Sequence, residues 1–99
     1  MRTIITLPEA DADFLRIYEH YAFERGLPDV ARRIDEAIRN AIEEFLIEFP
    51  GIGRSFKVDG ESLRGLLVMR THWVMYSYDD EFVYIHNIFA AKEFATRGK

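Results

Sequence analysis

A break at Pro50-Gly51-Ile52-Gly53-Arg54 divides the chain into two halves with different hydrophobic periodicity. Before the break, apolar residues recur at intervals of three and four, which is the spacing of amphipathic helices. After it come dense runs of β-branched and aromatic residues: Leu63–Arg70, Trp73–Tyr78 and Glu81–Phe89. With a short strand expected over residues 2–5, this order predicts an α+β fold: a short N-terminal strand, an antiparallel helical hairpin, a three-stranded antiparallel meander and a short C-terminal segment.

The first helix is expected to begin near Pro8 and to end at Gly26. Thr6 and Glu9 have the spacing of a capping box, in which a hydroxyl and a carboxylate each bind a free backbone N–H. Pro8 in the first turn removes no helical hydrogen bond, and Gly26 suits a helix C-cap. The apolar stripe of this helix comprises Ala10, Phe14, Ile17 and Tyr21.

The second helix is expected to run from Pro28-Asp29 to the Pro50-Gly51 break. The short Gly-Leu-Pro connection makes the two helices antiparallel neighbours. Ile42, Leu46 and Ile47 widen the apolar stripe, so they either pack on the sheet or bind a partner chain. The stripe itself is predicted to be core and comprises Ala31, Ile34, Ile38, Ala41, Phe45 and Phe49.

Two sequence signals predict turns between the strands. Asp59-Gly60 is typical of a tight hairpin, and Asp79-Asp80 lies between two strongly β-prone runs. A two-residue turn at Asp79-Asp80 would pair Trp73 with His86 and would place His72 on the opposite face of the sheet. The two histidines then cannot share a metal ion, and neither a metal site nor a cofactor is predicted.

Length and composition exclude several classes of protein. The 99 residues predict a single domain over 1–99, too short for a Rossmann unit with a second domain. The absence of cysteine excludes disulfides and thiolate metal sites. The N-terminus has neither the apolar core nor the cleavage site of a signal peptide, and no apolar run approaches the roughly 20 residues that span a bilayer. A cytoplasmic protein with no membrane contact is predicted.

The charge is unevenly distributed. The net charge is −4 and the pI about 5.3, which disfavours extensive phosphate binding. Residues 1–50 hold six Lys+Arg against eleven Asp+Glu, whereas residues 51–99 hold seven against six. Because the helical half is acidic, any contact with a polyanion must be local and must use the sheet half.

The chain resembles the RelE/ParE superfamily of bacterial toxins over nearly its whole length. The resemblance is carried by short elements in the right order: Pro8, Ala10, Asp13-Phe14-Leu15, Ile17 and Tyr18 to Tyr21, the Ala- and Ile-rich second helix, Pro50-Gly51-Ile52-Gly53-Arg54, Leu63-Arg64-Gly65-Leu66, Tyr76 and Val83-Tyr84-Ile85. It implies the fold predicted above. It also implies neutralisation by a co-expressed antitoxin that wraps the toxin, with Ile42, Leu46 and Ile47 as the candidate contact residues.

Two activities are known in this superfamily. RelE-like members cleave messenger RNA on the ribosome without a metal, and ParE-like members poison DNA gyrase. The cations that RNA cleavage would use here are Arg54, Lys57, Arg64 and Lys92. Family nucleases often carry a histidine at the end of the third strand, where this chain has Phe89, and no tyrosine follows residue 84.

The resemblance therefore favours a ParE-like toxin that inhibits gyrase by binding and is not itself an enzyme. The predicted target-binding residues are Arg64, Ala91, Lys92, Phe94 and Arg97. The alternatives are a RelE-like ribosome-dependent endoribonuclease, with ribosome and mRNA as partners, and a degenerate, non-toxic binding module. A hetero-oligomer with the antitoxin is expected.

Overall fold

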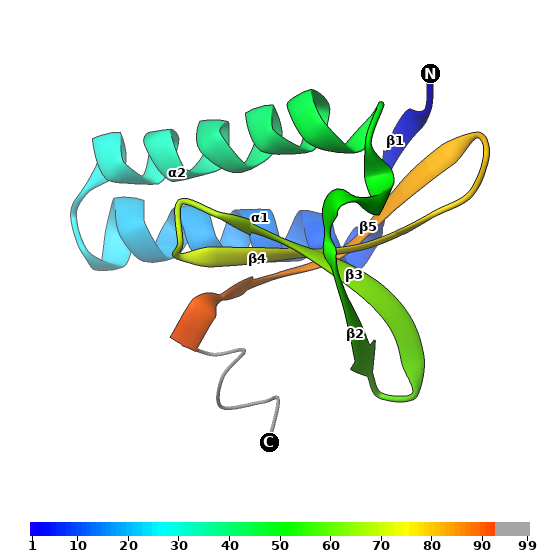
Figure 1. Cartoon of the computed structure of the whole chain (residues 1–99). Coiled ribbons are helices and arrows are strands. Elements are labelled where there is room, and N and C mark those ends of the chain that lie inside the picture. The colour runs from blue at the N-terminus through cyan, green and yellow to red at the C-terminus, as the bar shows by residue number, and fades with distance from the viewer. Residues whose placement is uncertain (93–99) are drawn as a thin grey trace.

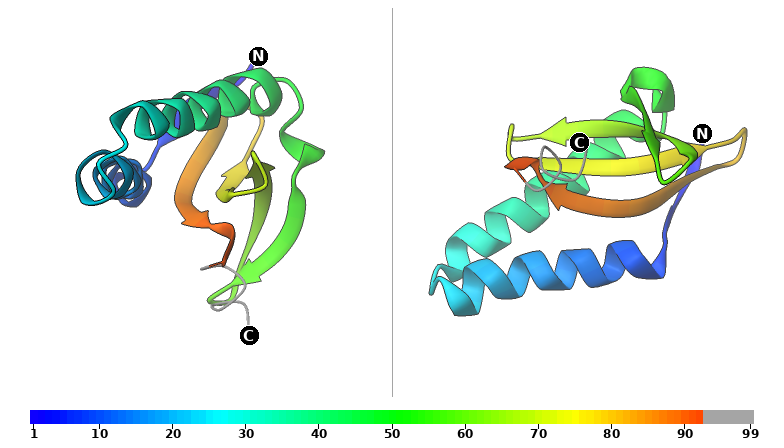
Figure 2. Two further views of the ribbon diagram at one scale, coloured as in Figure 1. Left: turned by 90° about the vertical axis from the view of Figure 1, so that its left-hand side faces the viewer. Right: turned by 90° about the horizontal axis from the view of Figure 1, so that it is seen from below.

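The computed structural model describes residues 1–92 and shows two helices packed on one face of a five-stranded sheet (Figures 1 and 2). None of the helices in these residues is long and apolar enough to cross a membrane. The strands and helices, in chain order, are β1 (Thr3–Thr6), α1 (Pro8–Glu19), α2 (Pro28–Ala41), β2 (Arg54–Val58), β3 (Glu61–Val68), β4 (His72–Tyr78) and β5 (Phe82–Ala90). Residues 1–92 also contain three short helical turns: η1 (His20–Glu24), η2 (Ile42–Leu46) and η3 (Pro50–Ile52).

The sheet has the strand order β1-β5-β4-β3-β2. β1 pairs in parallel with β5, and every other neighbouring pair is antiparallel. The predicted α+β fold is therefore confirmed. One strand was not predicted: β2 extends the meander at its outer edge. It is short and half polar, and it is defined by the Asp59-Gly60 turn, where φ of +50° and +83° fits a tight hairpin.

The pairing of β4 with β5 differs from the prediction. Asp79 N–H donates to the Phe82 carbonyl and Tyr78 pairs with Val83, so the turn lies at Asp80-Glu81 and not at Asp79-Asp80. A β-bulge then shifts the register between Met75 and Tyr76, so Trp73 pairs with Phe89. The predicted Trp73–His86 pair is wrong, because the turn lies one residue later than predicted and the bulge adds a residue, and the sequence pattern reveals neither.

The start of α1 also differs in one detail. The helix begins at Pro8 as predicted, but Thr6 is the last residue of β1 and Leu7 occupies the N-cap without a side-chain hydrogen bond. The predicted capping box is therefore wrong, because strand pairing with β5 occupies Thr6. The end of the helical segment matches the prediction, with φ of +67° at Gly26.

A π-helical turn at the end of α2 changes which apolar residues are buried. A π turn accommodates one more residue than an α turn. The predicted core positions Phe45 and Phe49 therefore each move by one residue, whereas Ala41, which precedes the turn, is half-buried against the core. The buried positions beyond Ile38 are Ile42, Leu46 and Pro50, and both phenylalanines are exposed.

The apolar residues form one cluster on each face of the sheet. The larger cluster lies between the helices and the sheet, with Phe14, Ile38, Leu46, Tyr76 and Ile85 among its members. The smaller one lies on the open face and comprises Leu63, Met75 and Phe89, flanked by Phe56, Val58 and Trp73. The rings of Phe56 and Trp73 meet edge to face above Gly65, where an added Cβ would lie 2.7 Å from Phe56 and 3.0 Å from Trp73.

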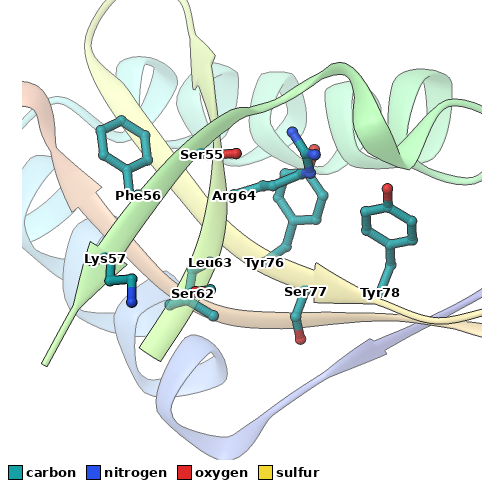
Figure 3. A pocket seen from close by; sticks show the side chains of 9 residues that line it. All are labelled: Ser55, Phe56, Lys57, Ser62, Leu63, Arg64, Tyr76, Ser77 and Tyr78. Atoms are coloured by element: carbon teal, nitrogen blue, oxygen red, sulfur yellow. The ribbon is translucent and has the colours of Figure 1, made fainter. Parts of the chain in front are cut away.

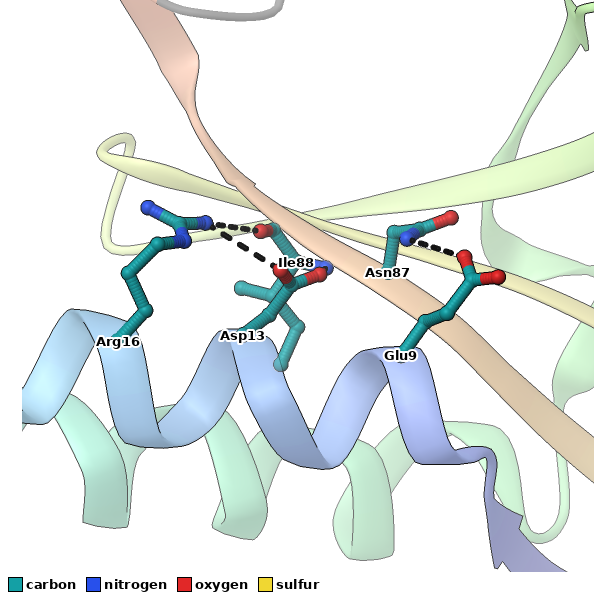
Figure 4. A network of polar contacts seen from close by, with 5 residues as sticks. All are labelled: Glu9, Asp13, Arg16, Asn87 and Ile88. Carbon is teal, nitrogen blue, oxygen red and sulfur yellow. Dashed lines mark hydrogen bonds and ion pairs between the residues drawn. The ribbon is translucent and has the colours of Figure 1, made fainter.

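Side chains of α1 cover the part of β5 that β1 does not reach (Figure 4). Asp13 Oδ2 accepts the backbone N–H of Ile88 at 2.9 Å, and Arg16 donates to the Ile88 carbonyl at 3.4 Å. Asn87 donates to Glu9 at 3.3 Å. These contacts pair backbone groups that a sheet edge would otherwise present to another chain.

Candidate functional site

A pocket of about 420 Å³ lies where β2, β3 and β4 meet (Figure 3). Lys57 and Arg64 contribute positive charge, and no carboxylate or histidine is among the lining residues. Hydroxyl groups make up most of the remaining polar lining. The lining comprises Ser55, Phe56, Lys57, Ser62, Leu63, Arg64, Tyr76, Ser77 and Tyr78. In a protein of net charge −4, this composition marks a local site for an anionic group.

Strand register brings the central residues of this pocket together. Arg64 pairs with Ser55 of β2 and with Tyr76 of β4, so the three side chains share one face of the sheet. Tyr76 also belongs to the core cluster beneath the helices, which identifies that face as the helix-covered one. The Arg64 guanidinium and the Tyr76 ring lie side by side in Figure 3.

Arg64 and Tyr76 together hold the turn that follows η2. The Tyr76 hydroxyl donates to the Pro50 carbonyl at 2.5 Å and accepts the Gly53 N–H at 2.9 Å. Arg64 Nη1 donates to the carbonyls of Gly53, at 2.7 Å, and Gly51, at 3.3 Å. Only Nη1 of the guanidinium is used within the described residues, so its other N–H groups can donate to a bound anion.

The close approach at Gly53 leaves no space for a side chain. An added Cβ would lie 2.3 Å from the Tyr76 hydroxyl and 2.9 Å from the Gly65 carbonyl. Burial raises the pKa of the Tyr76 hydroxyl above its usual value, although the Gly53 hydrogen bond and Arg64 oppose this shift. The phenol therefore stays protonated near neutral pH and serves as a structural donor rather than a base.

The structure brings together only two of the four cations predicted for RNA cleavage. Lys57 and Arg64 line the same pocket. Arg54 pairs with Gly65 and lies 5.3 Å from the centre of the Phe56 ring, which places it on the open face. It is not among the residues that line the pocket, although the Phe56 ring beside it is.

Lys92 lies near the opposite end of β4 from the pocket. The backbone N–H of Ala91 donates to the Thr71 carbonyl at 2.7 Å, which fixes the end of β5 beside the β3–β4 turn. Thr71 precedes Tyr76 by five residues, or about 17 Å of strand. The predicted catalytic set of Arg54, Lys57, Arg64 and Lys92 is therefore not assembled. Phe94 and Arg97, predicted to bind the target, lie outside the described residues.

The residues predicted to bind the antitoxin lie mainly in the core. Ile42 is 4% exposed and Leu46 is 0% exposed, because the π turn directs both toward the sheet. The prediction that Ile42 and Leu46 lie on the surface and contact the antitoxin is therefore wrong for this structure. Ile47 is half-buried and lines a cavity of about 230 Å³ with Ile4, Phe14 and Arg39 among other residues.

Sequence analysis missed two features of this region. One is that Tyr76 holds the turn at Gly53 through its hydroxyl. The only sequence signals for this contact are the glycine-rich break and a tyrosine in a core strand. The other is the exposure of Phe45 and Phe49, which an α-helical period assigns to the core. The apolar spacing of this segment does not reveal the π turn.

Comparisons with known proteins agree with this architecture. Residues 4–93 match the family described as ParE toxin of type II toxin-antitoxin system, parDE. No curated protein sequence matches the chain. A solved structure titled "Chromosomal ParDE TA system from P. aeruginosa" is similar with a TM-score of 0.74 and 21% identity, over 91% of this chain and 96% of that one. That likeness shows a shared fold, and the match over most of the sequence shows that this chain belongs to the ParE toxin family of type II toxin-antitoxin systems.

Proposed function

We propose that this ParE-family toxin acts in the cytoplasm by binding DNA gyrase, stalling the enzyme in its cleaved-DNA state, and that a cognate antitoxin neutralises it. The observation that carries a binding mode of action is the composition of the β2–β3–β4 pocket. It offers two cations and several hydroxyls, and its lining includes no histidine and no carboxylate. Such a site can hold a carboxylate or phosphate of its target, but it lacks a general base.

Arg64 is the proposed centre of target binding. Arg64 is half-buried and its guanidinium is held by two backbone carbonyls, so the remaining donors are oriented before the target arrives. Lys57 lines the same pocket. We include the C-terminal segment from Ala91 through Lys92, Phe94 and Arg97 as a further proposed contact region.

The decisive experiment measures supercoiling by purified gyrase in the presence of the toxin. We expect the wild-type toxin to reduce supercoiling and to accumulate cleaved DNA, and Lys57→Ala with Arg64→Gln to weaken this effect. Arg54→Gln is the matched control, because it removes an arginine from the opposite face. Unchanged supercoiling at saturating wild-type toxin would refute the gyrase proposal. Thermal unfolding of each variant separates lost binding from lost folding.

A ribosome-dependent RNase is the second candidate. It is favoured by the presence of two cations, Lys57 and Arg64, in one pocket. Both cations could stabilise a scissile phosphate. In that case, induction would stop translation first, and mRNA cut between defined codon positions would appear without DNA damage signalling. Reduced supercoiling with intact mRNA would exclude this candidate.

A further inference from the structure

The end of the helical hairpin presents an exposed apolar surface formed by Phe45, Phe49 and Ile52, here called the hairpin-end patch. Their exposed fractions are 37%, 60% and 55%. The backbone N–H of Phe49 donates to the Phe45 carbonyl, and the N–H of Ile52 donates to the Phe49 carbonyl. The three exposed residues therefore lie on one continuous turn of chain at the end of the hairpin.

The π turn is the structural reason for this patch. A regular α-helix would direct Phe45 and Phe49 toward the core, in line with Ile38. The extra residue of η2 instead buries Ile42 and Leu46 and turns the two aromatic rings outward. A large exposed apolar surface costs solubility unless another molecule covers it.

The rim of the patch is acidic. Glu43, Glu44 and Glu48 are all exposed, and no ion pair joins any of them to another of residues 1–92. The sequence contains no Lys or Arg between Arg39 and Arg54. Negative charge beside exposed aromatic rings favours a partner segment in which Lys or Arg alternates with apolar side chains.

The patch is continuous with the candidate functional pocket. A Cβ added at Gly51 would lie 3.4 Å from the hydroxyl of Tyr78, which lines that pocket. Arg64 binds the carbonyls of Gly51 and Gly53 in the same turn. A chain docked on Phe49 and Ile52 would therefore border the pocket opening.

We propose that the hairpin-end patch is the docking surface for an amphipathic, Lys/Arg-bearing segment of the antitoxin. Its apolar side chains cover Phe45, Phe49 and Ile52, and its cations meet the glutamates of the rim. This inference rests on the part of the proposed function in which a cognate antitoxin binds the toxin. It also gives neutralisation a steric basis, since the docked segment lies beside Arg64 and Tyr78.

The test compares two sets of variants in binding to the cognate antitoxin. Phe45→Ser with Phe49→Ser removes the apolar surface, and Glu44→Lys with Glu48→Lys reverses the rim charge. Phe23→Ser, 75% exposed in η1 at the other end of the hairpin, and Glu36→Lys, on the exposed face of α2, are the controls. Far-UV circular dichroism and thermal unfolding confirm that each variant folds.

We expect each patch variant to weaken antitoxin binding roughly tenfold or more, as truncation of a buried aromatic anchor does. The controls should bind as the wild type does. Rising salt should weaken the wild-type complex, and this dependence should be smaller for the rim variant. Toxicity in cells without antitoxin should be unchanged for Phe45→Ser with Phe49→Ser.

Three results would overturn the proposal. One is binding within about threefold of the wild type for both sets of variants. Another is normal antitoxin binding with lost toxicity, which would assign the patch to the target. The third is a wild-type homodimer in light scattering that the serine variant abolishes. If gyrase proves insensitive while the patch variants still lose the antitoxin, the gyrase proposal fails and this inference stands.

Discussion

The carboxylate of Asp13 accepts the backbone N–H of Ile88 at 2.9 Å and thereby joins α1 to β5 across most of the sequence. The parallel pairing with β1 ends at Ile85, so the N–H of Ile88 lies beyond the reach of the edge strand. A helix side chain takes the place that a strand would otherwise fill. This half of β5 is therefore closed to strand addition by another chain.

Asp13→Ala should destabilise the fold by about 1.5–3 kcal/mol, because a charge-assisted hydrogen bond is lost and a backbone donor is left without a partner. Urea unfolding measures the change. Asp11→Ala is the control, since Asp11 is exposed in the same helix and should cost less than about 1 kcal/mol. Equal losses in the two variants would show that helix electrostatics, and not the contact with Ile88, accounts for the effect.

The Tyr76 hydroxyl should be worth more to stability than any exposed tyrosine hydroxyl. Tyr76→Phe leaves the Gly53 N–H and the Pro50 carbonyl unpaired in a buried site, which should cost about 2–3 kcal/mol. Tyr78→Phe is the matched control in the same strand and should cost under about 0.5 kcal/mol.

Gly53→Ala tests the same contact from the other side. The added Cβ would collide with the Tyr76 hydroxyl, so the variant should lose about 1–3 kcal/mol. The double variant with Tyr76→Phe should lose less than the sum of the two single changes, because the colliding atom is gone. Strict additivity in urea unfolding would contradict this geometry.

Prediction from sequence fails here where a helix or a strand contains one extra residue. The helical hairpin and meander could be predicted because their apolar periodicity is strong on both sides of Pro50. The π turn in η2 and the bulge between Met75 and Tyr76 each shift a register by one residue. The sequence therefore predicts the elements correctly but not which side chains point into the core. Ile42 and Leu46 are buried where surface contacts were predicted, and Phe45 and Phe49 are exposed where core residues were predicted.

The π-shifted register makes a direct prediction about two adjacent residues. Leu46→Ala should destabilise the fold by about 2–5 kcal/mol, because it leaves a cavity beneath the helices. Phe45→Ala removes a larger side chain but should cost less, about 1–2 kcal/mol, since Phe45 is already 37% exposed. The reverse order in urea unfolding would mean that the helix continues without a π turn.

Asp79 should give the fold a specific acid sensitivity. Its carboxylate accepts the N–H groups of Phe82 and Glu81, and these bonds lower its pKa below the ordinary value. A carboxyl group with a lowered folded-state pKa stabilises the fold above its unfolded-state pKa, and that stabilisation disappears as pH falls through the folded-state value. Asp79→Ala should therefore be less stable than wild type at pH 7. The difference in urea midpoint should shrink as the pH falls below about 4, whereas a constant difference would exclude titration of Asp79 as the cause.

The β3–β4 turn offers the opposite kind of change, a gain in stability. Met69 and Arg70 adopt φ of +56° and +59°, a left-handed conformation that costs a non-glycine residue about 1 kcal/mol. Arg70→Gly should therefore stabilise the fold by about 0.5–1 kcal/mol and raise the melting temperature by a few degrees. Gly60→Ala is the mirror control, because φ there is +83° and no atom lies within 4 Å of an added Cβ. It should lower the melting temperature through backbone strain alone. A stabilising Gly60→Ala, or a destabilising Arg70→Gly, would show that side-chain contacts outweigh backbone conformation in these two turns.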